Sequence, residues 1–139
     1  MQWLTLALLS ALFAALSTIV GKLGVAKVDS TVTTMVRAAV GFMMLGVFVL
    51  ALGKMNDIST LRGKDALYVI LTGIFGTLSW LFYFWALKVG KVSQVAPIDR
   101  FSAVFAVILA VLLLGEKISW KTGLGAVIMT IGAILVALG

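Results

Sequence analysis

Residues able to do chemistry are few in this sequence, and their types exclude most enzymatic sites. The 139 residues include five Asp or Glu and eleven Lys or Arg, with neither cysteine nor histidine. The lack of cysteine and histidine removes disulfides, thiol nucleophiles, most zinc sites and histidine proton relays. Because carboxylates are also scarce, we expect a protein that is not an enzyme and that holds no metal or cofactor.

Arg37, Asp99 and Arg100 lie well inside long apolar segments. Ionisable groups at bilayer depth are costly, and they commonly mark the pathway of a substrate or an ion. Asp99 and Arg100 are neighbours in the stretch VAPIDRF, residues 95–101, and Asp99 is the only carboxylate within the apolar segments. These three side chains are therefore the first candidates for a substrate pathway.

Five apolar segments are long enough to place these side chains inside a membrane. The chain is 63% hydrophobic and 12% charged, whereas soluble domains are roughly a quarter charged. A helix needs about 20 mostly apolar residues to cross the hydrocarbon. We therefore predict an all-α membrane protein with five transmembrane helices that form one domain over residues 1–139. The predicted spans lie near residues 3–26, 30–53, 66–87, 92–114 and 119–138.

Three other interpretations of the composition are excluded. Strands of a membrane barrel would be about 9–11 residues long with alternating polarity, which these runs lack. The first span has no basic residues before it, and its uncharged stretch is longer than the roughly 7–15 residues of a signal-peptide core, so we expect a retained helix. The net charge of +6 is spread over short loops, as at membrane-spanning ends, so no nucleic acid is expected as a partner.

The depth of Arg37 and Asp99 in their spans is similar. Each lies seven residues after the start of its span, which is roughly 10 Å along a helix at about 1.5 Å per residue. Both spans start from the same side of the membrane, so Arg37 can reach the level of Asp99 and Arg100. Two interpretations stay open: a salt bridge that joins two helices, or a polar pocket in which the pair opens to accept substrate.

The third span supplies the predicted wall of such a pocket, namely Ser79, Trp80 and Tyr83. Small or hydroxylated residues recur along one face of this span at Thr72, Gly76, Ser79 and Tyr83. The span runs in the opposite direction, so Ser79 and Tyr83, near its end, approach the level of Arg37. Stripes of small residues are also common packing surfaces in membranes. The aromatic ring of Trp80 is either a packing residue or a contact for an organic solute.

Pro97 falls early in the fourth span. It follows Ser93, a residue type that commonly caps a helix, so proline would lie in or just past the first turn, where it does little harm. An unwound entry over residues 92–96 is the alternative. Its free backbone groups could then join the pocket, as the broken helices of transporters do.

Positive charges are nearly balanced between the two sides of the membrane. The side of the N-terminus receives Lys54, Arg62, Lys64, Lys117 and Lys121, and the opposite side receives Lys22, Lys27, Lys88 and Lys91. The positive-inside rule therefore gives little preference. The chain either keeps one orientation with its N-terminus inside, or inserts both ways, so that two opposed copies build an inverted-repeat transporter.

Several motifs occur in an order typical of one transporter family. The fourth span closes in Leu114-Gly115-Glu116, and the fifth is rich in glycine. An arginine lies early in the second span (Arg37), a lysine near the end of the first (Lys22), and the third contains the aromatic segment WLFYFWAL. Over essentially the whole chain these features resemble an EamA domain, the repeat unit of the drug/metabolite transporter superfamily.

The resemblance implies a function and a mode of assembly. Most members carry two such repeats in inverted orientation, which gives ten helices, whereas this chain carries one and resembles the single-repeat branch. It implies a multi-pass protein of the cell (inner or plasma) membrane that exports or exchanges small organic solutes, either metabolites or drugs. We expect a secondary transporter or facilitator that works by alternating access, with a homodimer, parallel or antiparallel, in place of the missing half. The rival functions are a flippase for lipids or lipid-linked sugars, and a membrane subunit that does not itself transport.

The chain departs from the related four-helix multidrug transporters. Those proteins use an acid in the first helix to exchange protons for cationic drugs, and residues 1–26 contain no acid here. Asp99 is the one obvious proton carrier, yet an Asp beside two arginines holds its negative charge firmly. The excess of arginine therefore favours anionic or zwitterionic solutes.

Overall fold

The computed structural model describes residues 2–139, and all regular structure in that range is helical. Within it, five helical segments are long and apolar enough to cross a membrane, which confirms the predicted fold class and a multi-pass membrane protein. The segments are α1 (Gln2–Val25), α2 (Ser30–Ala51), α4 (Gly63–Val89), α5 (Val92–Asp99) together with α6 (Phe101–Leu114), and α7 (Trp120–Leu138).

The predicted span limits agree with these helices to within three residues. The largest difference is at α4, which begins at Gly63, three residues before the predicted span. The first turn of this helix includes the charged residues Lys64 and Asp65. A span predicted from hydropathy stops where charges begin, while a helix can continue into the aqueous phase. A short helix in the connection before α4, α3 (Met55–Ile58), was not expected.

The helices are distributed over two compact units. We call residues 20–88 the central unit, and residues up to Ile19 together with Val89–Gly139 the terminal unit.

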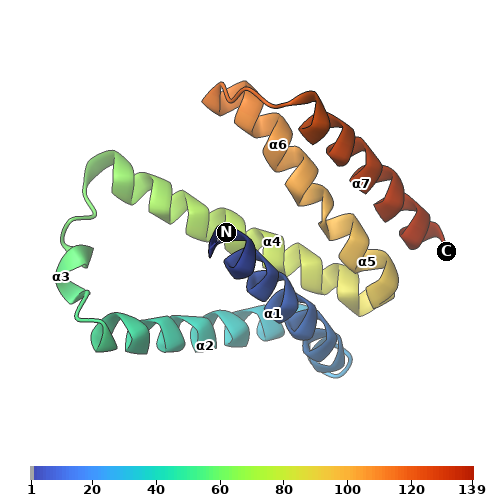
Figure 1. The fold of residues 1–139 in the computed structure, drawn as a ribbon. Helices are drawn as coiled ribbons and strands as arrows, with labels where there is room; N and C mark the ends of the chain where they lie inside the picture. Colours follow the sequence, from blue (N-terminus) through green and yellow to red (C-terminus); the bar gives the residue numbers. More distant parts are fainter. Residues whose placement is uncertain (1) are drawn as a thin grey trace. The chain divides into compact units, whose positions relative to one another are not determined.

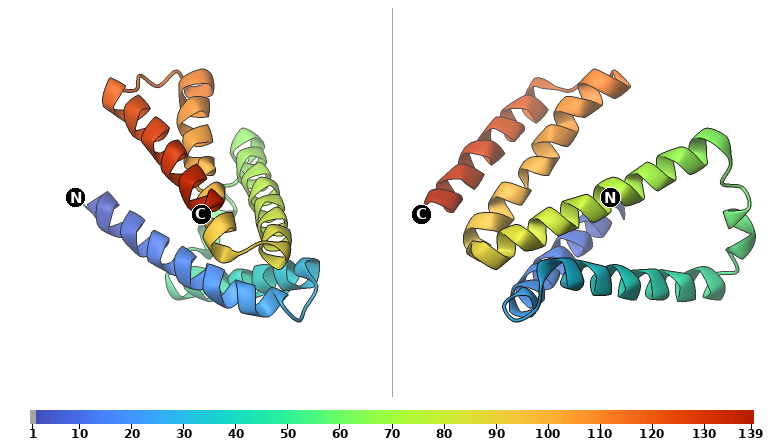
Figure 2. Two further views of the ribbon diagram at one scale, coloured as in Figure 1. Left: turned by 90° about the vertical axis from the view of Figure 1, so that its right-hand side faces the viewer. Right: turned by 180° about the vertical axis from the view of Figure 1, so that it is seen from behind.

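In the central unit, α2 and α4 meet where α2 begins and α4 ends, and they separate toward α3 (Figures 1 and 2). Side chains at the meeting point are buried: Val25, Ser30, Thr34, Phe84 and Leu87. Asp29 starts α2 as its N-cap, because its carboxylate accepts the backbone N–H groups of Thr31 and Val32, which the first turn of a helix leaves without an internal partner.

In the terminal unit, α7 packs against α5 and α6, and α6 and α7 run side by side in opposite directions (Figure 1). Gly115 ends α6 with a φ of 66°, a left-handed conformation that glycine adopts at little cost. The N–H of Glu116 then donates to the carbonyl of Ala110 at 3.2 Å. Ser119 caps the N-terminus of α7 by accepting the N–H of Thr122. The Leu114-Gly115-Glu116 motif therefore acts here as a helix stop.

The fourth span is broken at Arg100, between α5 and α6. The N–H of Arg100 donates to Pro97, and the carbonyl of Arg100 accepts from Ala103, each at 3.1 Å and three residues away. Hydrogen bonds between residues three apart tighten a helix into a 3₁₀ turn. This turn follows Pro97 by three residues, and the proline lacks the N–H that would complete the backbone hydrogen bonds of α5.

The expected position of Pro97, near the first turn of the helix, is confirmed, and the alternative of an unwound entry is excluded. Residues 92–96 are helical, and the N-cap is Lys91 instead of Ser93. Pro97 lies just past the first turn, where the missing N–H does not prevent the helix from starting. The interruption falls at residue 100, next to the two charged residues.

Candidate functional site

Arg37 forms a cation–aromatic cluster in the central unit. Its guanidinium carbon lies 4.6 Å from the centre of the Trp80 ring and 5.5 Å from that of Phe84, within the range in which a ring face attracts a cation. Within residues 20–88, all of which the structure describes, no carboxylate lies within salt-bridge distance of Arg37. The rings of Trp80 and Phe84 therefore lie against the charge of this half-buried side chain.

The two rings that contact Arg37, those of Trp80 and Phe84, lie on the same face of α4. Trp80 and Phe84 are four residues apart on α4, so they share one face of the helix. Phe84 is 2% exposed and Trp80 is 39% exposed. A Cβ at Gly21 would come within 2.6 Å of Phe84 Cε1. The Phe84 ring can occupy this position because residue 21 has no side chain.

Hydrogen bonds to the last turns of α4 fix the same region. The ammonium of Lys22 donates to the carbonyl of Leu87, and the hydroxyl of Ser30 donates to the carbonyl of Phe84 at 3.3 Å. Carbonyls at a helix C-terminus have no partner within the helix and carry partial negative charge, so a cation is stabilising there. The end of α4 that carries Trp80 and Phe84 is therefore anchored to α1 and α2.

Asp29 lies at the membrane-surface end of this cluster. The backbone N–H of Thr31 holds the pKa of its carboxyl below the ordinary value, with smaller lowering contributions from Val32 and from Lys88. The Lys88 ammonium is 4.0 Å away and both side chains are exposed. An exposed pair of this kind contributes little to stability, so the main role of Asp29 is to cap α2.

The predicted pathway residues are distributed over both units. In the central unit Arg37 and Trp80 are in contact, the ring of half-buried Tyr83 lies 5.9 Å from that of Phe84, and Ser79 is exposed on α4. Asp99 and Arg100 belong to the terminal unit. The proposed cluster of Arg37, Asp99 and Arg100 thus stays a prediction.

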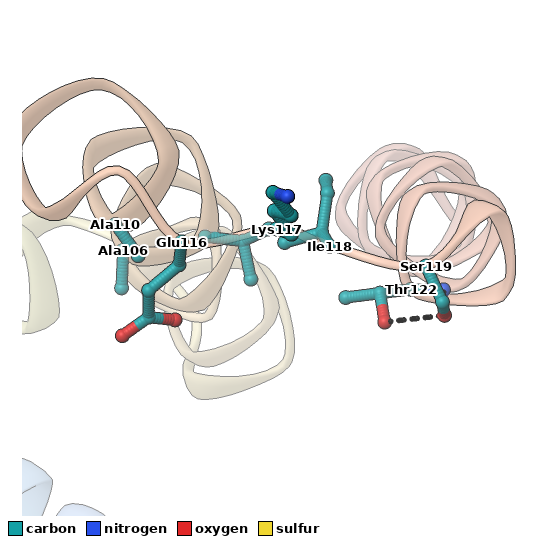
Figure 3. Close-up of a pocket in the computed structure, with 8 residues that line it drawn as sticks. Ala106, Ala110, Glu116, Lys117, Ile118, Ser119 and Thr122 are labelled. Atoms are coloured by element: carbon teal, nitrogen blue, oxygen red, sulfur yellow. Dashed lines mark hydrogen bonds between the residues drawn. The ribbon is translucent and has the colours of Figure 1, made fainter.

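Two cavities lie within the terminal unit. The first, about 460 Å³, is formed by the end of α6, the connection after it and the start of α7. Figure 3 shows the side chains of Glu116 and Lys117 pointing in different directions there, and the hydroxyls of Ser119 and Thr122 paired at 3.0 Å. The structure gives no salt bridge between Glu116 and Lys117 or Lys121 among the described residues. This cavity is at the end of the helices, where water is available.

The second cavity, about 530 Å³, lies between α1 and the start of the fourth span. Alanines from both helices, Pro97 and Arg100 contribute to its lining. Both helices belong to the terminal unit over the residues that line it.

Phe84, Gly21 and Ser30 are parts of the Arg37 cluster that sequence reasoning missed. The spacing of the sequence could have identified Phe84, since it lies one helical turn after Trp80 on the same face of α4. Gly21 belonged to a stripe of small residues in the first span, but a stripe does not identify the ring that packs against it. The hydrogen bond of Ser30 to a carbonyl 54 residues away has no local sequence signature.

The sequence resembles known proteins over nearly its whole length. The sequence pattern of the EamA-like transporter family matches residues 1–138. A protein from a Sinorhizobium species, described as an uncharacterized transporter in the cobO 3′ region, is 40% identical over 136 residues, which cover 98% of this chain and 96% of that protein. No solved structure matches the chain significantly.

Proposed function

The chain belongs to the EamA-like transporter family, and on that premise we propose that it is a secondary transporter or facilitator of small organic solutes that works by alternating access as a dimer. Family membership points to a transport role and away from an enzymatic one. What the proposal adds is the mechanism, the class of solute and the residues that bind it.

The position of Arg37 is the observation that carries the proposal. The residue lies seven positions after the start of α2, roughly 10 Å along the helix, and aromatic faces are its partners within the central unit. Cation–aromatic contacts are worth about 0.5–2 kcal/mol, and they leave the hydrogen-bond donors of the half-buried guanidinium able to bind an anion. A carboxylate of a solute would complete this interaction with a paired, charge-assisted hydrogen bond. We assign Arg37 as the substrate anchor.

The neighbours of Arg37 suit an organic anion or zwitterion. Trp80 offers a partly exposed indole for an apolar group, and Tyr83 and Ser79 supply hydroxyl groups one turn apart on α4. Asp99 is the exchange partner in this proposal. It pairs with Arg37 when the pathway is empty and yields to the solute when the pathway is filled, with Arg100 as a second positive group.

A dimer is proposed because one chain supplies five spans and most members of the family carry two repeats. The balance of five positive charges on one side and four on the other, counted over the loops, supports an antiparallel pair. Labelling of a Thr60→Cys variant tests this directly. Labelling from both faces of the membrane is expected, and labelling from one face alone would rule out opposed copies.

Flux measurements in liposomes test the transport function. The purified chain is reconstituted, and uptake of labelled amino acids, organic acids and cationic drugs is compared with that of empty liposomes. We expect flux for acids or zwitterions, and at least a tenfold loss in Arg37→Ala. Lys54→Ala, on the connection after α2, is the matched control and should retain flux.

Other outcomes would identify the rival functions. Equal flux in Arg37→Ala and Lys54→Ala would make Arg37 structural. Translocation of labelled lipid without solute flux would indicate a flippase. An absence of all flux, together with stable binding to a second membrane protein, would indicate a subunit that does not itself transport.

A further inference from the structure

The cavity between α1 and α5 combines an apolar wall with a single charged group. Mostly small or apolar side chains line it from both helices: Ala11, Ala15, Thr18 and Ile19 from α1, and Val92, Ala96 and Pro97 from α5. The Thr18 hydroxyl donates to the carbonyl of Ala14 on its own helix. Arg100 is the one charged residue of the lining, which includes no carboxylate. Its volume of about 530 Å³ lies within the roughly 300–1,000 Å³ of sites that bind organic ligands.

The cavity exists because small side chains oppose one another without the helices closing on them. Ala11 and Ala15 lie four residues apart, on one face of α1. Ala96 and Pro97 oppose them from α5. In membrane helices small residues usually permit close contact of the backbones. Here the helices remain apart, and the volume that larger side chains would fill is open.

Arg100 lies on the face of the fourth span that lines the cavity, four residues after Ala96 and eight after Val92. It is the residue between α5 and α6, and its side chain is exposed. Eight residues after the start of α5, it lies roughly 12 Å along the helix at about 1.5 Å per residue. Asp99 is its neighbour in sequence, but it is not among the lining residues, because consecutive residues of a helix point about 100° apart.

We propose that this cavity is a binding site for a soluble organic carboxylate with an apolar body. The carboxylate pairs with the guanidinium of Arg100, and the apolar body lies against the alanines of α1 and α5. A small inorganic anion would leave the apolar wall empty, and burial of its charge at this depth would be costly. An organic cation would be repelled by Arg100. The inference rests on the proposed transport function and names the chemical class of its substrate; the carboxylate site at Arg100 is a second one, in addition to the anchor proposed at Arg37.

Equilibrium binding tests the site without requiring transport. The probe is radiolabelled 4-phenylbutyrate, added to the full-length protein in nanodiscs of phosphatidylcholine, a lipid without net charge. Its competitors are 4-phenylbutanol and 4-phenylbutylamine, which keep the apolar body and change the charge. We expect unlabelled phenylbutyrate to compete at least tenfold better than the alcohol, and the amine not to compete.

Four variants and one control distinguish the contribution of the Arg100 charge from that of the cavity volume. Ala96→Leu fills the cavity and should weaken phenylbutyrate binding at least tenfold, with Ala15→Leu as the second variant if Ala96→Leu does not fold. Arg100→Gln should weaken binding to a similar extent, and Arg100→Lys should restore part of it. Ala103→Leu on α6 lies outside both cavities and should bind like the wild type.

Three results would overturn the site. Equal competition by the alcohol and the acid would show that Arg100 does not bind the carboxylate. Full binding by both leucine variants would show that the ligand does not bind in this cavity. Retention of phosphatidylglycerol in wild type but not Arg100→Gln, with no displacement by phenylbutyrate, would assign the site to a lipid headgroup. Intact binding with no flux of any solute would contradict the transport proposal and leave this site standing.

Discussion

The central and terminal units stabilise their helices in different ways. In the central unit a small core of buried side chains surrounds Phe84 and Leu87, and polar side chains donate to carbonyls of another helix. In the terminal unit Thr18 and Ala133 are the buried side chains among the described residues, and both described cavities lie there. The central unit therefore contains most of the buried side chains and the interhelical hydrogen bonds, and the terminal unit combines the packing of α7 against α5 and α6 with these two cavities.

This difference shows how one residue type can serve two purposes. Arg37 lies over two rings at a helix junction that hydrogen bonds fix in place. Arg100 lies at a helix break with an exposed side chain beside an apolar cavity. The first arrangement holds an arginine in a defined orientation, while the second allows an arginine to adapt to a ligand. Substitutions that affect one unit and spare the other test the contrast.

Removal of the Phe84 ring should have the largest effect. Phe84→Ala is expected to lower the free energy of unfolding by about 3 kcal/mol, the lower end of the range for cores, because in lipid the loss is mainly one of packing. Phe105→Ala in the terminal unit, where the ring is 61% exposed, should cost less than about 1 kcal/mol. Chemical denaturation in mixed micelles measures the free energy of unfolding of both variants. Equal decreases would show that the two units do not differ in the way proposed.

A side chain at residue 21 should have the next largest effect. Gly21→Ala places a methyl group 2.6 Å from the Phe84 ring, and overpacking of this kind costs about 1–3 kcal/mol. Gly41→Ala, also within a helix, meets no atom within 4 Å. It should be neutral or stabilise by up to about 1 kcal/mol, since alanine favours helix. Thermal unfolding of the two variants compares them, and a stable Gly21→Ala would show that the packing around Phe84 is loose.

Loss of the Ser30 hydroxyl should have a smaller effect. Ser30→Ala removes the hydrogen bond to the Phe84 carbonyl and should destabilise the protein by about 1 kcal/mol. Ser102→Ala on α6, where the serine is exposed, should change stability by less than about 0.5 kcal/mol. If Ser30→Ala matches Ser102→Ala, the junction depends on packing and not on this bond.

Acidification should produce the smallest effect, through Asp29. Because the folded state lowers the pKa of this carboxyl, its stabilising contribution is present above the unfolded value and is lost as the pH falls through the folded one. The Tm of the wild type should therefore fall between about pH 5 and pH 3 more than that of Asp29→Asn, which keeps a capping oxygen without a titrating group. Identical pH dependence in the two proteins would exclude this role.

Hydropathy was sufficient to predict the five spans, because a lipid environment imposes both the helical state and its minimum length. Their limits differ from the structure mainly at charged ends such as Lys64 and Asp65, where helix and membrane need not stop together. The break at Arg100 could not be located in this way. Proline identified a weak segment, but the position of the interruption depends on local hydrogen bonds to Pro97 and Ala103.

The sequence also predicted Arg37 and Trp80 as pathway candidates, because depth in a span and spacing along a helix can be counted from residue numbers. The structure brings the two side chains into contact, and their role in a pathway stays a prediction. The sequence did not indicate Phe84 as the buried ring, since that choice depends on the space left by Gly21 on another helix. The cavity beside Arg100 was missed for the same reason. Alanines on two helices define an open volume only when their packing distance is known, and no periodicity in the sequence specifies that distance.

The pairing of α7 with α5 and α6 has a consequence for biogenesis. Asp99 and Arg100 each oppose insertion from a translocon by at most about 2.5–3.5 kcal/mol, the value at a helix centre, and the thirteen Phe, Val, Ile or Leu residues of α5 and α6 favour it by about 0.3–0.6 kcal/mol each. The sums are similar, so the fourth span is marginal by itself. The last span has its one charge, Lys121, at its first turn. The two spans therefore enter the bilayer most readily as a hairpin, which makes synthesis of the C-terminal helix a requirement for committing Arg100 to the membrane.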